Sequence, residues 1–140
     1  MPATASVASG AEFTSGALAL LLPRRRVIGI AEMMNYPGVI ASDREVLNKI
    51  RIAGHRRVDG HAPGLTGKEL CAYVDAGIHS DHECVTAAEA REKLRMGMYI
   101  MIREGTTEKN LKALITVGNP QNSVQVRLVT DDRHPGDTIA

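Results

Sequence analysis

Four short apolar runs along the chain each end directly in a cluster of acidic or histidine residues. Each run predicts a buried strand, and the polar cluster at its end predicts a site. The four segments are 28–32, 58–61, 78–83 and 128–132. Stretches with helical spacing lie between them, so the chain repeats a strand, a polar cluster and a helix. That repeat is typical of a parallel (β/α) barrel, in which functional side chains stand at the carboxyl ends of different strands.

The hydrophobic spacing and the turn residues predict five strands that alternate with five helices. Strands are expected at 27–31, 57–60, a brief one opening at 78, 98–102 and 124–129. Helices are expected at 12–22, 42–52, 66–77, 86–97 and from 106 or 107 to about 117. The stretch 36–38 predicts a loop, and residues 1–9 predict a loop or the tail of a strand.

Capping boxes are expected at the starts of three of these helices. In this motif a hydroxyl side chain accepts a backbone N–H, and a glutamate three residues later reaches back to the first residue. The three pairs are Ser42 with Glu45, Thr66 with Glu69, and Thr86 with Glu89.

The chain length limits how much of a barrel can form. A complete (β/α)8 barrel needs about 250 residues and at least about 200, whereas this chain has 140. About five strand–helix units therefore fit. The fold class we expect is α/β, a partial TIM-like (β/α) barrel that forms a single incomplete barrel segment over residues 1–140. A smaller α/β arrangement is the alternative.

Charge and composition argue against several classes of function. The net charge of +1 gives no electrostatic case for binding nucleic acid or an anionic membrane, and an aromatic content of 3% offers no base-stacking platform. The sequence contains no signal-peptide or transmembrane pattern. The two cysteines lack ligand spacing and predict free thiols in a reducing cytoplasm.

Glu32 and His61 are the first two candidate site residues. A carboxylate at the end of a buried strand, such as Glu32, is costly unless it is paired or binds a metal; an exposed loop glutamate is the alternative. His61 lies in a turn rich in glycine and proline, which suits a rigidly presented side chain. Asp59, two residues earlier, is expected to orient the His61 ring. A histidine bonded only to backbone is the alternative.

The segment 79–83 packs four ionisable side chains into five residues. On a strand His79 and His82 point to opposite faces, so only one is expected to be a ligand. His82, flanked by Asp81 and Glu83, is better placed for a metal or acid–base role. A solvated loop is the alternative for this segment.

Two further polar clusters end the last strands. Burial of the adjacent Asp131 and Asp132 without a cation would be costly, so one is expected to ligate a metal or act as base while the other binds substrate. A pair of aspartates that begins a loop is the alternative. Arg103 would clamp an anion, with Glu104 bridging to it, and a structural ion pair is the competing interpretation.

Five segments together resemble the adenine deaminases of the amidohydrolase superfamily. They are 29–39, 59–65, 80–83, 97–105 and 130–135, and they cover most of the chain in order. The resemblance implies a TIM-like barrel with a binuclear divalent metal centre, of manganese or iron. It also implies hydrolytic deamination of adenine to hypoxanthine and ammonia, with a small purine as the binding partner.

The resemblance also implies roles for individual residues. Glu32 resembles the metal-bridging carboxylate, His61 and His82 the ligands after two later strands, and Asp131 the aspartate that ligates metal and handles the proton of the attacking water. Asp132 would contact the purine, although the roles of the two aspartates could be exchanged. Our catalytic set is Asp131, His82 and Glu83, our substrate contacts are Asp132 and Arg103, and our metal ligands are Glu32, His61, His82 and Asp131.

The resemblance has one departure. It implies a His-x-His pair of metal ligands, and none of the five histidines lie two apart. We therefore expect the central-to-late segment of a deaminase barrel, with homo-oligomerisation left open. Two alternatives remain: a non-catalytic remnant or purine- or metal-binding module, and another amidohydrolase acting on a cyclic amide.

Overall fold

Five parallel strands form one sheet, and they follow one another in chain order. The computed structural model describes residues 10–138, so the loop or strand tail expected over 1–9 lies outside the described residues. The strands are β1 (Gly29–Met33), β2 (Arg57–Gly60), β3 (Ser80–Asp81), β4 (Tyr99–Arg103) and β5 (Val126–Val129). Each pairs in parallel with the next, in the order β1-β2-β3-β4-β5. Doubly wound sheets reverse their order at a switch point, and this sheet does not. The predicted partial TIM-like α/β fold is confirmed.

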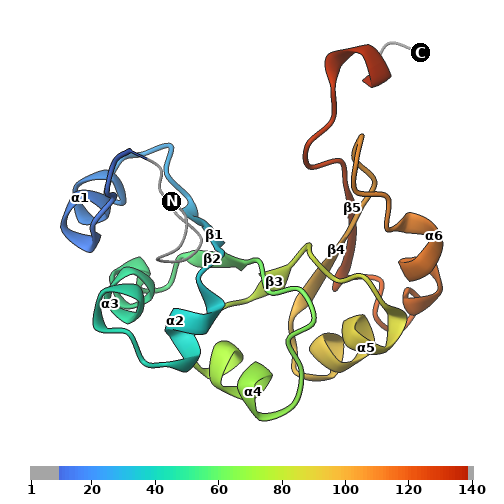
Figure 1. Cartoon of the computed structure of the whole chain (residues 1–140), viewed down its shortest axis with the longest axis horizontal. Coiled ribbons are helices and arrows are strands. Elements are labelled where there is room, and N and C mark those ends of the chain that lie inside the picture. The colour runs from blue at the N-terminus through green and yellow to red at the C-terminus, as the bar shows by residue number, and fades with distance from the viewer. Residues whose placement is uncertain (1–9, 139–140) are drawn as a thin grey trace.

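The helices between the strands lie in an arc along one side of the sheet (Figure 1). They are α2 (Tyr36–Ile40), α3 (Arg44–Ala53), α4 (Gly67–Asp75), α5 (Ala87–Arg95) and α6 (Leu111–Leu114), with the 3-10 helix η1 (Ile115–Val117). The helix α1 (Ser15–Leu21) precedes β1, and the 3-10 helix η2 (Pro135–Thr138) follows β5. Right-handed crossovers between neighbouring parallel strands place successive helices on the same face, which explains the arc. Across the described residues, none of these helices combines the length and apolar character that a membrane span requires.

The core lies between this arc and the sheet, in two clusters. Ile30 and Val58 of β1 and β2 pack with Tyr73 of α4, and Ile100 and Ile102 of β4 belong to the second cluster, beneath α5 and α6. The opposite face of the sheet is more open and carries polar residues. The expectation of fully buried strands is therefore wrong for the alternate residues, because helices cover one face only.

Three local predictions need correction. The stretch 36–38, expected to be a loop, begins α2, because the Asn35 side chain accepts a hydrogen bond from the Gly38 amide at 3.0 Å. The N-cap of α3 is Asp43 and not Ser42, since Asp43 Oδ1 accepts from the Val46 amide at 2.9 Å. The helix expected from 106 begins only at Leu111 and continues as the 3-10 helix η1.

Candidate metal centre

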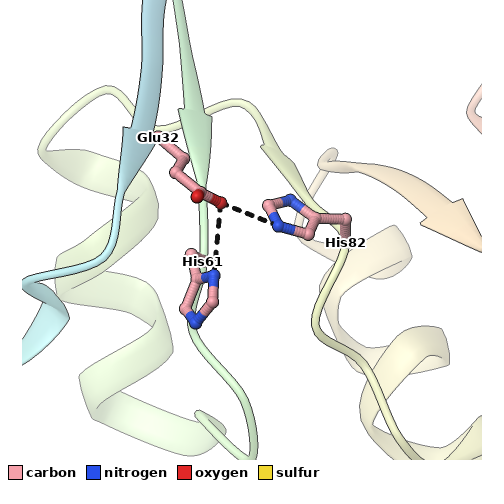
Figure 2. A group of neighbouring side chains, drawn as sticks. All are labelled: Glu32, His61 and His82. Carbon is pink, nitrogen blue, oxygen red and sulfur yellow. Dashed lines mark hydrogen bonds and ion pairs between the residues drawn. The ribbon is translucent and has the colours of Figure 1, made fainter. Parts of the chain in front are cut away.

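Three side chains from three successive strand units converge at the carboxyl edge of the sheet. Glu32 lies in β1, His61 follows β2 directly, and His82 follows β3 directly. Glu32 Oε2 lies 3.2 Å from His61 Nδ1 and 2.7 Å from His82 Nε2, so one carboxylate oxygen meets both rings (Figure 2). The two imidazole centroids are 5.3 Å apart with the ring planes at 78°. Parallel pairing brings about this meeting, because neighbouring strands end at the same edge.

Tyr73 of α4 ties the first two of these strand ends together. Its hydroxyl donates to the backbone carbonyl of Met33 at 2.8 Å and accepts from the backbone amide of His61 at 3.1 Å. The ring is fully buried, and burial raises the pKa of the Tyr73 hydroxyl well above its ordinary value. The hydroxyl therefore stays neutral and available for both hydrogen bonds.

A second group of ligand atoms shares His82 with the first. His82, Glu83 and Asp131 each offer one atom within 4.8 Å of the others, as do Glu32, His61 and His82 in the first group. Glu83 Oε1 lies 3.6 Å from His61 Nδ1 and 3.7 Å from His82 Nε2. The two groups therefore form one continuous set of carboxylates and imidazoles.

Arg103 holds the two carboxylates of the second group. Its Nη1 contacts Glu83 Oε1 and lies 2.7 Å from Asp131 Oδ2, and its Nη2 lies 2.9 Å from Glu83 Oε2. Partial burial disfavours the charge, but the hydrogen bonds to Asp131 and Glu83 outweigh it, so the pKa of Arg103 is raised. A structural ion pair, one of the two interpretations of Arg103, is thus present, although its partner is not Glu104. The Glu104 carboxylate instead accepts from the Leu111 amide at 3.0 Å.

A pocket of about 400 Å³ opens on the uncovered side of the sheet beside these groups. It is lined by Ala31, Glu32, Met34, Asp59, His82, Met101, Val129 and Asp131. Apolar surface from Met34, Met101 and Val129 faces the acidic and imidazole groups. Mostly apolar walls with a few convergent polar groups are typical of a small-molecule site.

Comparison with known proteins identifies relatives over almost the whole chain. An adenine deaminase of Dehalococcoides mccartyi is 52% identical over 137 residues, which is 98% of this chain and 24% of the relative. Adenine deaminase 2 of Carboxydothermus hydrogenoformans is 46% identical over 139 residues, 99% of this chain and 24% of the relative. Another from Clostridium acetobutylicum is 49% identical over 141 residues, 99% of this chain and 25% of the relative.

The chain is homologous to the adenine deaminases. It spans about a quarter of the length of these curated relatives. No family model matches it. The resemblance inferred from the five sequence segments is therefore confirmed.

The donor set of the first group fits a divalent cation. Ligand atoms about 2.1 Å from one ion lie roughly 3 Å from each other, and the two contacts of Glu32 Oε2, 2.7 and 3.2 Å, match that spacing. Imidazole with carboxylate is a donor combination that first-row transition metals accept. Glu32, His61 and His82 therefore form a group that could hold a metal ion.

Other predicted residues lie elsewhere than expected. Asp59 lines the pocket, but its carboxylate accepts from Ser80 Oγ at 2.6 Å, and the His61 ring contacts Glu32 and Glu83 instead. The expectation that Asp59 orients His61 is wrong. Asp132 is exposed, and its backbone carbonyl accepts from the Thr106 amide at 3.0 Å.

The sequence did not predict the buried ion cluster beneath the site. Lys93 and Glu89 of α5 are buried, as is Asp81, and Lys93 contacts both carboxylates. Tyr73 was likewise missed. The one available signal for Glu89 was its capping-box spacing, and that pattern predicted a helix start and no buried role.

Proposed function

We propose that this chain supplies the metal-binding and acid–base side chains of a metal-dependent adenine deaminase. The reaction is a hydrolysis in which adenine and water give hypoxanthine and ammonia. The main support is the convergence of Glu32, His61 and His82 from three consecutive strand ends beside a pocket. The homologues named adenine deaminase indicate the reaction, and the donor set indicates a cation.

The proposed cofactor is a binuclear divalent centre of manganese or iron. Support comes from two groups of ligand atoms that share His82, one with Glu32 and His61 and the other with Glu83 and Asp131. Such cations, when bound, supply Lewis-acid polarisation and bring the pKa of a coordinated water close to neutral. Asp131 is the proposed aspartate ligand, as the sequence predicted.

The chain's own residues would position the reactants and move protons. Arg103 holds Asp131 Oδ2 at 2.7 Å and so fixes the direction of the carboxylate that would accept the proton of the attacking water. Glu83 accepts a hydrogen bond from the same guanidinium and lies within 3.7 Å of His61 Nδ1 and His82 Nε2. It is the candidate to pass a proton toward the departing ammonia.

The substrate would be a small purine held in the pocket of about 400 Å³. Met34, Met101 and Val129 offer apolar surface to a flat ring, while Asp131 offers an acceptor for a ring N–H. Asp132 and Arg103 stay the proposed substrate contacts. The proposed compartment is the cytoplasm, in keeping with the free thiols Cys71 and Cys84. The proposal leaves open whether the protein forms a homo-oligomer.

One observation favours a second candidate, a metal- or purine-binding module without turnover. Arg103 already satisfies Glu83 and Asp131, the carboxylates that catalysis needs. A module of this kind would bind a cation at Glu32, His61 and His82 and leave adenine unchanged.

A chimera separates the two candidates. The matching quarter of the Dehalococcoides mccartyi adenine deaminase is replaced by this chain, and adenine conversion is followed with Mn(II) present. Turnover that disappears with a chelator and with Glu32→Gln supports the deaminase proposal. A chimera that folds and binds Mn(II) as its parent does, yet leaves adenine unchanged, contradicts it and supports the binding module. The isolated chain, reconstituted with Mn(II), is assayed in parallel.

A further inference from the structure

A fully buried lysine stands directly beneath the two histidine loops. The Lys93 ammonium of α5 donates to three acceptors: the Ala62 carbonyl at 2.7 Å, Asp81 Oδ2 at 2.5 Å and Glu89 Oε1 at 2.6 Å. The side chain has no solvent exposure. A buried charge is costly unless it is paired and fully hydrogen bonded, and this one is.

The partners of Lys93 are the chain neighbours of the proposed metal ligands. Ala62 directly follows His61, and Asp81 directly precedes His82. Asp81 reaches further with its other oxygen, because Oδ1 accepts from the Glu83 amide at 2.7 Å and lies 3.5 Å from the Ala62 amide. A single carboxylate thus meets the backbone of both loops.

Glu89 extends the same cluster to the far ends of the loops. Its Oε1 accepts from the Gly64 amide at 2.8 Å, and its Oε2 accepts from the Val85 amide at 3.2 Å. The first amide closes the loop that carries His61, and the second closes the loop that carries His82. The cluster therefore contacts each loop next to its histidine and again at the third residue after the histidine.

The charge state of the cluster is fixed by its own members. Burial opposes the charge on Lys93, but the two carboxylates outweigh burial and raise the pKa of Lys93. Asp81, Cys84 and Glu89 also lie within 4.8 Å of one another, a spacing that a metal ion would accept. The ammonium already contacts both carboxylates, and burial raises the pKa of the Cys84 thiol, so this group acts as an ion cluster.

We propose that Lys93, Asp81 and Glu89 are positioning residues that fix His61 and His82 at the separation a divalent cation requires. The proposal rests on the proposed function only in that a cation binds at Glu32, His61 and His82. The cluster touches neither cation nor substrate and acts through backbone groups next to the ligands. Loosening it lets the rings move apart and lowers metal affinity, while the ligands themselves stay unchanged.

The test compares two variants with a control in the full chain. The double variant Lys93→Met with Glu89→Gln removes one charge of each sign and keeps the side-chain volumes. Asp81→Asn is the milder second variant and decides the question if the double variant does not fold. Val46→Ala is the control, because it truncates the core at α3, a helix that carries none of the site residues.

Two readouts are used, one without any cation and one with Co(II). Without cation, NMR follows the contact between the His61 and His82 rings and the exchange of the Ala62, Gly64 and Glu83 amides. With Co(II), visible absorption titration gives the affinity. We expect the variants to lose the ring contact and to exchange these amides faster. We also expect them to bind Co(II) at least about tenfold more weakly, because mutation of residues that support metal ligands lowers metal affinity by about that factor. The control should stay within about twofold of wild type.

Folded variants with wild-type ring contact, amide exchange and Co(II) affinity would overturn the positioning role. So would a loss of affinity in Val46→Ala as large as in the variants, because general destabilisation would then explain both. Failure of the proposed function is visible separately, in the wild-type chain. If that chain binds no Co(II), the metal proposal is contradicted, and the positioning role is judged on ring contact and exchange alone.

Discussion

Replacement of Tyr73 by phenylalanine tests the link between the Glu32 strand and the His61 loop. The buried hydroxyl serves two backbone groups, the Met33 carbonyl at 2.8 Å and the His61 amide at 3.1 Å. Tyr73→Phe leaves both without this partner, and each unsatisfied buried polar group costs about 1–3 kcal/mol. Because the hydrogen bond to the His61 amide is only partly buried, we expect a total loss of about 2–4 kcal/mol.

Urea unfolding at neutral pH measures this loss. The midpoint should fall with an unchanged slope, since the surface exposed on unfolding is the same. Tyr99→Phe is the matched control, because the Tyr99 ring lies on the open face beneath the guanidinium groups of Arg57 and Arg127. Its loss should stay within about 0.5 kcal/mol. A Tyr73→Phe loss as small as that of the control would refute the assigned hydrogen bonds.

The pH dependence of the same difference follows from the raised pKa of Tyr73. Burial favours the protonated hydroxyl, so the folded state holds this proton more tightly than the unfolded chain does. The resulting stability is fully present below the unfolded pKa of about 10 and is lost as pH rises toward the folded value. The difference between wild type and Tyr73→Phe should therefore be constant from about pH 6 to 9. A difference that falls within that range would contradict a neutral, buried hydroxyl.

Three further changes test other parts of the structure. Gly60→Ala places a Cβ against the Ser80 carbonyl and 2.8 Å from the Tyr73 hydroxyl, and it should cost about 1–3 kcal/mol in urea unfolding. Burial raises the pKa of Cys84, so stability should fall as pH rises above the unfolded thiol value of about 8.5, and Cys84→Ala should flatten that fall. Glu32→Gln keeps the side-chain shape but removes the charge, and calorimetry should show Mn(II) affinity lowered more than about tenfold; equal affinity would exclude Glu32 as a ligand.

The sequence predicted the strands well because short apolar runs between turn residues have few other structures open to them. The predicted strand at 57–60 has the bounds of β2, and the strand at 98–102 differs from β4 by one residue at each end. The first strand is displaced by two residues, so Glu32 lies inside β1 rather than after it. Boundaries depend on pairing with the neighbouring strand, and a single strand's sequence does not contain that information.

The capping boxes show how tertiary contacts reassign a local signal. Thr86 caps α5 as expected and accepts from the Glu89 amide at 3.3 Å. The Glu89 carboxylate, however, turns to Lys93 and the two histidine loops. Glu45, expected to complete a box with Ser42, instead accepts from the Ser15 hydroxyl of α1 at 2.9 Å. A glutamate near a helix start satisfies whichever donors the fold brings to it, and distant donors are invisible to local spacing.

The candidate site was predictable for a related reason. Parallel strands in chain order end at one edge, so polar residues after successive strands meet, and Glu32, His61 and His82 do. The sequence did not predict which carboxylate contacts which imidazole ring, because that depends on the angle at which the backbone leaves each strand. Asp59 therefore bonds Ser80 rather than His61. Lys93 was not found, since a lysine in an amphipathic helix normally reaches solvent.

The side-chain charges around the proposed centre indicate which of its two positions would bind a cation first. The two groups of ligand atoms contain three carboxylates, those of Glu32, Glu83 and Asp131, and the Arg103 guanidinium neutralises one of them. With neutral imidazoles, two negative charges remain, which one divalent cation balances. The first group, Glu32 with His61 and His82, has no guanidinium contact among the described residues, so in the proposed centre it would bind a cation before the second group. A second cation at His82, Glu83 and Asp131 would have to replace the hydrogen bonds that Arg103 makes to both carboxylates. On this proposal Arg103 would be the residue that decides whether one cation or two can bind.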